Sequence, residues 1–458
     1  MNYYLAIDIG ASSGRHILCS LQDDKLVLEE VYRFCNNVVK KEGHYHWDID
    51  NLFDQIKTGL KECKKVGKIP KTMAIDTWAV DYALLDKSGQ AINGVYAYRD
   101  SRNDKGVKSI QSKIAPEKLY GLTGLQFQKF NTIYQLSSED DRAKKEACDF
   151  LMVPDYLNYL LTGEMANEYT NMSTTQLLDI KTNKLDESLV ELTGFNPDIF
   201  KKMVMPGTKL GHFAKDIAGE VGFDCEVVVP ATHDTGSAYM AAIEANSIIL
   251  SSGTWSLLGI ESLEPIVNEA ARLANFTNEG GYNYRYRFLK NIMGLWIIQE
   301  VAREYHGEYG FGQLVEMARK EPFKGIFDVN ADRFLKPENM IEEIIAYFKE
   351  RDQACPKTAG EIAYCVYNSL AYCYKEAIEE LEAITGNEYG TINIIGGGCQ
   401  NILLNEMIAA TCNKRVVAGP IEATALGNIL SQLISDGVVN SLEQGRKLIR
   451  DSFEIKTY

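Results

Sequence analysis

The chain has 458 residues, 45% of them hydrophobic, and because a single packed core rarely extends to this length we expect two domains. Its 63 acidic and 48 basic side chains leave a net charge of −15, which disfavours nucleic acid or an anionic membrane surface as a partner. No apolar run reaches the roughly 18 residues that span a bilayer and no signal-peptide pattern is present, so we expect a cytoplasmic protein.

The first ninety residues alternate apolar strands with turns. Strands are predicted over 3–10, 15–22 and 25–34, and their close succession predicts two adjacent hairpins. Residues 50–67 have apolar side chains at helical spacing, and the apolar stretch 72–86 reads as a further strand. Strands that alternate with helices predict an α/β sheet.

The second half of the chain repeats this plan. Residues 105–225 are predicted to be more helical and less regular than the first ninety residues. Residues 247–262 are then predicted to form a strand, a glycine turn and a second strand. A long helix is predicted over 360–385 with Gly386 as its stop, and 391–412 read as a strand, a glycine triplet and a helix. The two halves are therefore interpreted as distant copies of one plan.

Three glycine-containing turns follow buried strands, at Gly10–Arg15, Ser251–Thr254 and Gly396–Gly398. Glycine lets backbone N–H groups approach an anion, and the third turn precedes a helix whose N-terminus also favours anions. None matches the P-loop or the dinucleotide-binding pattern. A tight hairpin explains any one of them, but the combination in both halves predicts a nucleotide clamp.

Three aspartates stand out from their apolar or aromatic surroundings. Asp8 lies inside a strand, where its partner is either a hydrated Mg²⁺ or neighbouring backbone N–H groups. Asp76 and Asp81 flank Trp78, an arrangement that grips a polyol, although core packing explains Trp78 equally well.

Asp234, in the sequence "THDTGSA", is the candidate general base for phosphoryl transfer to a hydroxyl. It lies in a polar turn that leads into a helix of small residues, where a substrate can approach. The competing interpretation is an ordinary helix N-cap at Asp234 or Thr235.

Histidine and cysteine do not predict a metal centre. His44 and His46 have strand spacing but no third ligand nearby in sequence, so a hairpin tip is predicted there. The ten cysteines show no C-x-x-C spacing, and most are expected to be reduced core residues. The tyrosine-rich segment 280–291 is predicted to be a surface hairpin that leads to Asn291.

Seven segments, in order, carry a family resemblance that spans almost the whole chain: "DIGASSGR", "DTWAVDYALLD", "HDTGSA", "LSSGTWSLLG", "NEGG", "LKNIMGLW" and "GGGCQN". The chain resembles the FGGY carbohydrate kinases of the actin-like ATPase fold. The resemblance implies two actin-like (ribonuclease H-like) α/β domains around an ATP/sugar cleft. Residues 1–242 then supply the sugar site and the phosphate loop, and 243–458 the nucleotide site.

The resemblance also implies an activity, the ATP-dependent phosphorylation of the 1-hydroxyl of L-rhamnulose to L-rhamnulose 1-phosphate in L-rhamnose breakdown. It assigns Asp234 as general base, places Asp8 near Mg²⁺, and makes ATP and a small-molecule sugar the partners of a monomer or small homo-oligomer. The implied ATP contacts are Ala11, Ser12, Ser13, Gly14, Arg15, Thr254, Gln299 and Gly397, and the implied sugar contacts are Ala79, His233, Asp234, Thr235 and Asn291.

One position departs from the family pattern: Ala79 stands where glycine is usual, at a position that touches the sugar. The added methyl group narrows the pocket, so L-fuculose, L-xylulose or another ketose stays open as the substrate. A nucleotide-dependent switch of the actin or Hsp70 kind is a more distant alternative.

Overall fold

The computed structural model describes residues 1–458, and the chain forms two compact units. The first contains Met1–Ala241, Ser262–Phe288 and Ala423–Ser452, and the second contains Ala242–Glu261, Leu289–Glu422 and Phe453–Tyr458. Each unit is built from strands and helices, which confirms the α/β class with two domains. Segments far apart in the sequence therefore fold together, above all the C-terminal stretch 423–452 with the first unit.

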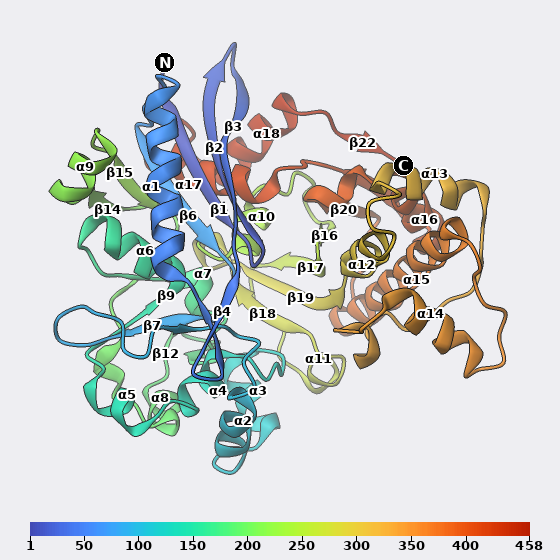
Figure 1. The fold of residues 1–458 in the computed structure, drawn as a ribbon, viewed down its shortest axis with the longest axis horizontal. Coiled ribbons are helices and arrows are strands. Elements are labelled where there is room, and N and C mark those ends of the chain that lie inside the picture. The colour runs from blue at the N-terminus through green and yellow to red at the C-terminus, as the bar shows by residue number, and fades with distance from the viewer. The chain divides into compact units, whose positions relative to one another are not determined.

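A six-stranded sheet lies at the centre of the first unit (Figure 1), in the order β14-β15-β6-β1-β2-β3. β1 pairs in parallel with β6 and β6 in parallel with β15, whereas β1–β2, β2–β3 and β14–β15 are antiparallel, so both predicted hairpins are confirmed. The strands are β1 (Tyr3–Ile9), β2 (Ser13–Gln22), β3 (Lys25–Cys35), β6 (Thr72–Thr77), β14 (Thr208–His212) and β15 (Glu226–Val229).

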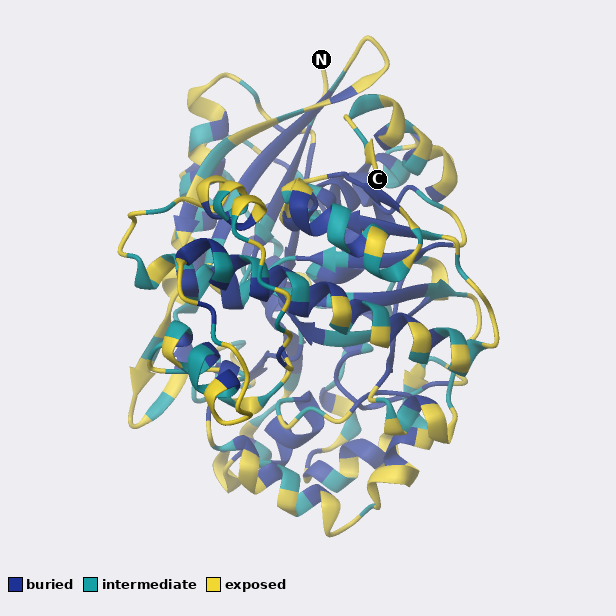
Figure 2. Ribbon diagram, turned by 90° about the vertical axis from the view of Figure 1, so that its right-hand side faces the viewer, coloured by how far each residue is buried: buried dark blue, intermediate teal, exposed yellow.

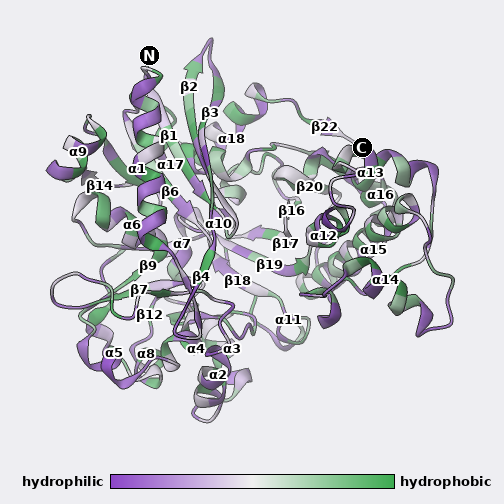
Figure 3. Cartoon of the chain, in the orientation of Figure 1, coloured by the Kyte–Doolittle hydropathy of each residue, from purple (hydrophilic) through white to green (hydrophobic).

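The two faces of this sheet are covered differently, because side chains alternate between the faces of a strand. Leu5, Ile7 and Ile9 join a buried core with the apolar faces of α1 (Ile49–Lys65) and α6 (Val153–Thr162). The opposite faces of α1 are polar and apolar in Figure 3. Asp8 and its register partner Asp76 point to the other face of the sheet, where α17 (Ala423–Ser435) packs.

The rest of the first unit consists of short elements. The segment predicted as a hairpin tip, residues 44–48, is instead mostly strand β5, and the turn of that hairpin lies at residues 42–43. The elements are β4 (Val38–Lys41), β5 (His44–Trp47), β7 (Tyr82–Leu85), β8 (Val95–Tyr96), α2 (Asn103–Gln111), α3 (Pro116–Thr123), α4 (Thr132–Ser137), α5 (Asp141–Glu146), β9 (Asp149–Met152), β10 (Asn167–Glu168), α7 (Tyr169–Met172), β11 (Leu178–Asp179), β12 (Lys184–Leu185), α8 (Glu187–Thr193), β13 (Met203–Val204), α9 (Lys215–Val221), α10 (Asp234–Met240), α11 (Glu269–Leu273), β18 (Thr277–Gly280) and α18 (Leu442–Ser452).

The sheet of the second unit repeats the first. Five consecutive strands of its seven-stranded sheet, β17-β16-β20-β21-β22, correspond to β2-β1-β6-β15-β14: an antiparallel hairpin, two parallel steps and an antiparallel edge strand. The interpretation of two copies of one plan is thus confirmed. The strands are β16 (Ile248–Ser252), β17 (Trp255–Ser262), β20 (Thr391–Ile395), β21 (Arg415–Ala418) and β22 (Lys456–Thr457), and β19 (Tyr286–Met293) enters this unit at residue 289.

Helices carry the remainder of the second unit. The long predicted helix is α15 (Ala359–Thr385), which begins at a Thr358–Glu361 capping box and stops at Gly386 in the left-handed conformation, as expected. Figure 2 shows the buried residues concentrated in the strands and on the inner faces of the helices. The other helices are α12 (Trp296–Glu304), α13 (Phe311–Lys320), α14 (Met340–Lys349) and α16 (Ile402–Cys412).

Candidate active site

The turn between β1 and β2 is a rigid loop with an exposed tip. The Gly10 N–H donates to the Ser13 carbonyl over 2.9 Å. Asn36 holds the turn from behind: its backbone N–H donates to the Ser12 carbonyl and its side-chain amide to the Gly10 carbonyl, each over 2.9 Å. Ala11 and Ser12 are exposed. Such a turn suits recognition of phosphate by backbone N–H groups.

Asp8, the aspartate inside an apolar strand, is paired with Arg15 from the same hairpin. The two are register partners, and Nη2 of Arg15 lies 2.8 Å from Oδ2 of Asp8. The side chain of Asp8 keeps 13% of its exposure and that of Arg15 21%. The partner predicted from the sequence was either a metal or backbone N–H groups, whereas the structure supplies a guanidinium.

Three carboxylates of the first unit, those of Asp8, Asp76 and Asp234, repel one another. Burial, and then the charge of Asp8, raises the pKa of Asp76 well above its usual range. The side chain of Asp234 is 32% exposed, yet desolvation by the surrounding protein, and then the charge of Asp8, raises its pKa to about 7. Oδ2 of Asp76 accepts from Asn428 over 2.7 Å, while its buried Oδ1 has no hydrogen-bond partner.

This donor set fits Mg²⁺. Carboxylate oxygens are its preferred ligands, Oδ1 of Asp76 lacks a partner, and a cation would relieve the repulsion among the three carboxylates. No three His, Cys, Asp or Glu side chains are grouped closely enough to hold a metal by themselves. Mg²⁺ commonly takes only one or two carboxylates and completes its coordination with water and substrate phosphates.

Asp234 is the first residue of α10, and its carboxylate accepts hydrogen bonds from the next residue, Thr235. Its Oδ1 accepts from the Thr235 N–H over 2.6 Å and from the Thr235 hydroxyl over 3.1 Å. His233 occupies the N-cap position without a side-chain cap bond, so the N-cap interpretation of Asp234 or Thr235 is wrong. The Thr77 N–H donates to the Thr232 carbonyl over 2.9 Å, which brings the end of β6 beside this helix start.

A buried pair beside His233 was missed by the sequence analysis. The hairpin predicted over 280–291 is present, because β18 and β19 are neighbouring strands joined by a turn whose tip, Asn283 and Tyr284, is exposed. Its second arm does not lie at the surface, since β19 (Tyr286–Met293) is largely buried and Arg287 is only 1% exposed. Nη1 of Arg287 lies 3.0 Å from Oε2 of Glu279, and Nη2 lies 3.0 Å from Nδ1 of His233. An arginine flanked by apolar residues is the one signal that pointed to a buried acidic partner.

Asp81 and Trp78 have structural roles. The carboxylate oxygens of Asp81 accept from Trp47 Nε1 (2.6 Å), Trp78 Nε1 (2.9 Å), Gln135 Nε2 (2.9 Å) and the Tyr98 N–H (3.1 Å). Burial raises the pKa of Asp81 to about 6 against these bonds. Three of these bonds go to Oδ2 and one to Oδ1. Asp81 is only 1% exposed and Trp78 6%, so the structure favours core packing over the expectation that the two residues grip a polyol.

Ala79 is half-buried and precedes a strained turn. The Asp81 N–H donates to the Ala79 carbonyl over 3.0 Å across Val80, whose φ is +69°. A β-branched residue rarely adopts positive φ, and it persists only where its surroundings enforce it. Thr132 and Gln135 do so here by donating to the Val80 carbonyl over 2.7 and 3.1 Å. The methyl group of Ala79 is therefore held in a fixed place.

In the second unit, the β16–β17 turn meets the start of α12. Thr254 is exposed at the tip of the turn. The Leu295 N–H donates to the Gly253 carbonyl over 2.9 Å and the Trp296 N–H to the Thr254 carbonyl over 3.2 Å. These bonds attach the turn to the helix that carries the half-buried Gln299.

The glycine triplet packs on the same hairpin. A Cβ atom on Gly398 would lie 2.0 Å from Oγ of Ser252, the last residue of β16, so only glycine fits there. Gly397 is exposed, and a Cβ atom on it would meet no other atom within 4 Å. Gly397 and Gly398 begin a 3₁₀ turn, Gly397–Gln400, and α16 follows at Ile402, so the triplet precedes a helix as predicted. Asn291 lies half-buried in β19.

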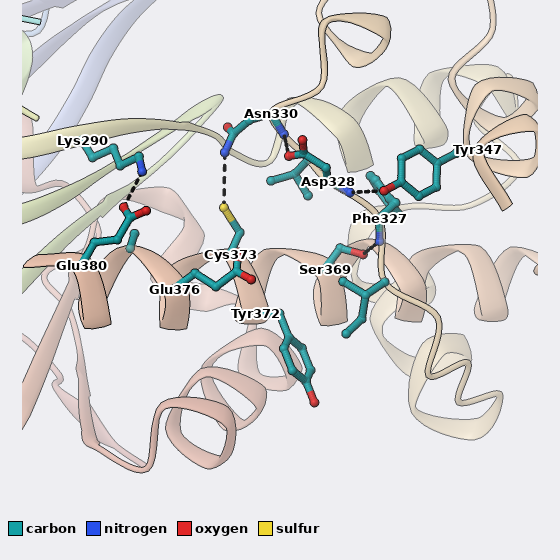
Figure 4. A pocket seen from close by; sticks show the side chains of 13 residues that line it. Lys290, Phe327, Asp328, Asn330, Tyr347, Ser369, Tyr372, Cys373, Glu376 and Glu380 are labelled. Atoms are coloured by element: carbon teal, nitrogen blue, oxygen red, sulfur yellow. Dashed lines mark hydrogen bonds and ion pairs between the residues drawn. The ribbon is translucent and has the colours of Figure 1, made fainter. Parts of the chain in front are cut away.

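The second unit also contains a pocket of about 290 Å³ between α15 and residues 326–330 (Figure 4). Lys290 pairs with Glu380 over 2.5 Å at one end, and the Asn330 amide donates to Cys373 Sγ over 3.4 Å (Figure 4). None of the predicted ATP or sugar residues lines it. It is therefore separate from the candidate site.

Two expectations from composition concern the whole chain. All ten cysteines are free thiols, and half of them are buried: Cys19, Cys63, Cys225, Cys365 and Cys399. Burial raises the pKa of the Cys19 thiol to about 12, as expected of an inert core residue. No helix combines the length and apolar character that crossing a membrane requires.

Comparison with known proteins places both halves of the chain in one family. Residues 3–241 match the N-terminal domain of the FGGY family of carbohydrate kinases, and residues 248–435 match its C-terminal domain. A rhamnulokinase of Halalkalibacterium halodurans is 51% identical over 100% of this chain and 99% of its own length. A rhamnulokinase of Oceanobacillus iheyensis is 50% identical over 99% of this chain and 97% of its own length.

A solved structure agrees at the level of the fold. Ligand-bound xylulose kinase from Lactobacillus acidophilus superposes with a TM-score of 0.81 over 99% of this chain and 93% of its own, at 15% identity. This likeness supports the fold alone and confirms the predicted two-domain actin-like architecture. With family models matched over both halves and close relatives over the full length, the chain belongs to the FGGY family of carbohydrate kinases.

Proposed function

We propose that this kinase transfers the terminal phosphate of ATP to the 1-hydroxyl of L-rhamnulose and yields L-rhamnulose 1-phosphate in L-rhamnose breakdown. The observation that carries the proposal is the 51% identity over the whole chain to a relative named rhamnulokinase. Identity at this level extends over both units, so it includes every segment from which the site is built.

Asp234 is the proposed general base. A sugar hydroxyl is far less acidic than a carboxylic acid, so Asp234 accepts the proton as the O–P bond forms and does not remove it beforehand. Its raised pKa, about 7, makes it a better proton acceptor than an ordinary aspartate and still leaves it ionised in a large fraction of molecules at neutral pH. Its partial exposure leaves the carboxylate accessible to the hydroxyl.

The remaining roles are proposed from the family pattern together with the local geometry. His233, Thr235, Ala79 and Asn291 contact the sugar. In the first unit Ala11 to Arg15 hold phosphate, and in the second unit Thr254, Gln299 and Gly397 hold the nucleotide. Asp8 is the proposed Mg²⁺ residue, with Asp76 behind it, and the ion when bound neutralises phosphate charge. Arg15, which is paired with Asp8, places a cation at the end of the Ala11–Arg15 loop.

The division of labour follows the domains proposed from the sequence, with residues 1–242 for sugar and phosphate loop and 243–458 for the nucleotide. We further propose a cytoplasmic monomer or small homo-oligomer that acts on small molecules, without nucleic-acid or membrane partners. The net charge of −15 supports the absence of nucleic-acid and membrane partners.

A second candidate is the same reaction on another ketose, such as L-fuculose or L-xylulose. Ala79 favours it, because the strained turn at Val80 holds its added methyl group rigidly where the family has glycine. A difference of one methyl group in a pocket changes discrimination between substrates by about 1–3 kcal/mol, so it alters preference without altering chemistry.

A coupled ADP-release assay with Mg-ATP tests both candidates against L-rhamnulose, L-fuculose, L-xylulose, L-ribulose, D-fructose and glycerol. We expect the highest kcat/KM for L-rhamnulose. A higher value for another ketose moves the assignment to that sugar, and Ala79→Gly then tests the cause. ATP hydrolysis that no sugar changes would instead support a nucleotide switch of the actin or Hsp70 kind.

The same assay tests the proposed base with Asp234→Asn. This variant keeps the shape of the side chain but cannot accept the proton, so we expect kcat to fall about 100- to 10 000-fold. ATP binding, measured by calorimetry, is expected to stay within a few-fold of the unmodified protein. Full activity in the Asp234→Asn variant removes Asp234 from the mechanism.

A further inference from the structure

Three buried side chains from three elements meet beside the proposed base. His233 precedes α10, Glu279 lies in β18 and Arg287 lies in β19, and all three belong to the first unit. Arg287 is 1% exposed, and His233 and Glu279 are each 7% exposed. Two hydrogen bonds orient Arg287: Nε donates to the Gly280 carbonyl over 3.0 Å, and Nη2 lies 3.0 Å from His233 Nδ1. Its Nη1 also lies 3.0 Å from Glu279 Oε2, as an ion pair without hydrogen-bond geometry.

The contact between Arg287 and His233 determines which imidazole nitrogen carries the proton. A guanidinium has five N–H donors and no acceptor, and it stays charged. A nitrogen 3.0 Å from Nη2 must therefore offer a lone pair, so Nδ1 of His233 is unprotonated. The ring is then neutral with its proton on Nε2, because a doubly protonated ring has no lone pair to offer.

The Glu279 carboxylate stabilises the guanidinium of Arg287 and does not draw the proton to Nδ1 of His233. Its Oε2 lies 3.4 Å from Nδ1 of His233, a position that by itself would favour a proton on Nδ1. The same oxygen lies closer, at 3.0 Å, to Nη1 of Arg287, and this pairing compensates a charge that is costly to bury alone. Glu279 thus anchors the guanidinium, and the guanidinium selects the tautomer.

On the other side of the ring, Nε2 of His233 lies 3.4 Å from Oδ1 of Asp234. We propose that Arg287, anchored by Glu279, is a positioning residue that holds His233 as an Nε2–H donor next to the Asp234 carboxylate. A sugar that enters then meets one fixed donor and one fixed acceptor side by side. With the other tautomer, two lone-pair acceptors would face each other and the donor would be lost. The consequence for catalysis rests on the proposed function, whereas the assignment of the His233 tautomer is independent of it.

The tautomer is measured directly by long-range ¹⁵N–¹H NMR on the full chain labelled with ¹⁵N-histidine, with His233→Gln used to assign the signal among the six histidines. We expect the Nε2–H pattern for His233. In the single variant Arg287→Met, which leaves Glu279 as the acceptor beside Nδ1, we expect this pattern to be lost and a proton to appear on Nδ1. The double variant Arg287→Met with Glu279→Met removes the pair without leaving a buried charge and is used for the activity measurement.

Activity gives the second readout. The double variant is expected to lose about 10- to 100-fold in kcat/KM for the sugar while KM for ATP stays unchanged. Arg287→Lys, whose ammonium also has only donors, is expected to keep the Nε2–H pattern and most of kcat. The matched control is Arg102→Met with Glu139→Met, because this pair is also buried and also 3.0 Å apart but does not contact His233. In the control variant we expect the Nε2–H pattern of His233 and the kcat/KM for the sugar to stay unchanged.

Two results would overturn the proposal: an Nδ1–H or doubly protonated His233 in the unmodified protein, or an unchanged Nε2–H pattern in Arg287→Met together with full kcat in the double Met variant. Should the double variant fail to fold, the spectra of the unmodified protein and of Arg287→Lys still show which nitrogen of His233 carries the proton. An unmodified protein that shows the Nε2–H pattern but phosphorylates no sugar would refute the proposed function and leave the tautomer assignment standing.

Discussion

Asp234 differs from an ordinary aspartate in two ways that bear on proton transfer. Desolvation and the neighbouring Asp8 raise its pKa to about 7, whereas the Thr235 N–H and hydroxyl stabilise its charged form and limit the rise. The same two bonds orient the carboxylate, since both go to Oδ1. The residue type and its polar turn were evident from the sequence, but the raised pKa depends on burial in the folded chain and then on Asp8, which lies 226 positions earlier.

The raised pKa predicts how the reaction depends on pH. Only ionised Asp234 accepts a proton, so kcat/KM for the sugar is expected to rise with pH and to level off above about 7. Below the midpoint the expected loss is about tenfold per pH unit, because a single group titrates. The measurement is kcat/KM from pH 5 to 9 at saturating Mg-ATP.

An acid limb with its midpoint near 4 would contradict this prediction, since it would belong to a carboxylate of ordinary pKa. Stability is recorded over the same range by circular dichroism, so that loss of folded protein at low pH is separated from loss of ionised base.

At the scale of elements, the three glycine turns fall where the sequence predicted them, and the two units use the first two in the same way. Gly10–Ser12 connects β1 to β2, and Gly253–Thr254 connects β16 to β17. Glycine and alternating apolar residues are local signals, so these hairpins could be predicted from the sequence. The packing of Gly398 on Ser252 could not be predicted, because β16 and β20, the two strands that it joins, pair in parallel but lie far apart in the sequence.

Gly397 and Gly398 make a matched pair for testing that packing. Gly398→Ala forces a methyl group onto Ser252 of β16, including its backbone oxygen at 2.9 Å, so we expect the free energy of unfolding to fall by about 1–3 kcal/mol. The methyl group that Gly397→Ala adds would lie in open space, so this variant is expected to leave the free energy of unfolding unchanged. Thermal denaturation of both variants checks this, and equal melting temperatures would contradict the packing.

At the scale of the whole molecule, helix α17 completes the first unit although it comes almost last in the chain. Its Asn428 donates to Asp76 and its Gln432 donates to the Leu5 carbonyl over 2.9 Å and accepts from Thr72 over 2.6 Å. It also crosses α10, the helix that begins with Asp234, so closely that a Cβ on Gly427 would lie 1.7 Å from the Ser237 carbonyl oxygen.

Gly427→Ala therefore tests whether α17 supports the site from behind. Helix propensity alone predicts that alanine stabilises by about 1 kcal/mol, whereas the crossing predicts a loss of about 3 kcal/mol or more together with a shift of α10. Gly219→Ala in α9 is the control, because it meets no atom within 4 Å and is expected to be neutral or stabilising. Melting temperature and kcat are measured for both, and a stabilised Gly427→Ala variant would contradict the crossing.

The sequence by itself determined the local elements and the family: β1 and its hairpin, α1, α15 with its stop at Gly386, and the position of Asp234. The local elements depend on spacing over one or two turns of helix or a few strand residues, whereas the family is indicated by short motifs in a fixed order along the chain. Only the tertiary structure decided that Asp81 is internal and that Arg287 reaches His233 across 54 positions and Asn428 reaches Asp76 across 352. Such pairs depend on strand order and helix packing, because a buried charge or amide takes whichever partner the fold brings within about 3 Å, and that partner leaves no periodic signal in the chain.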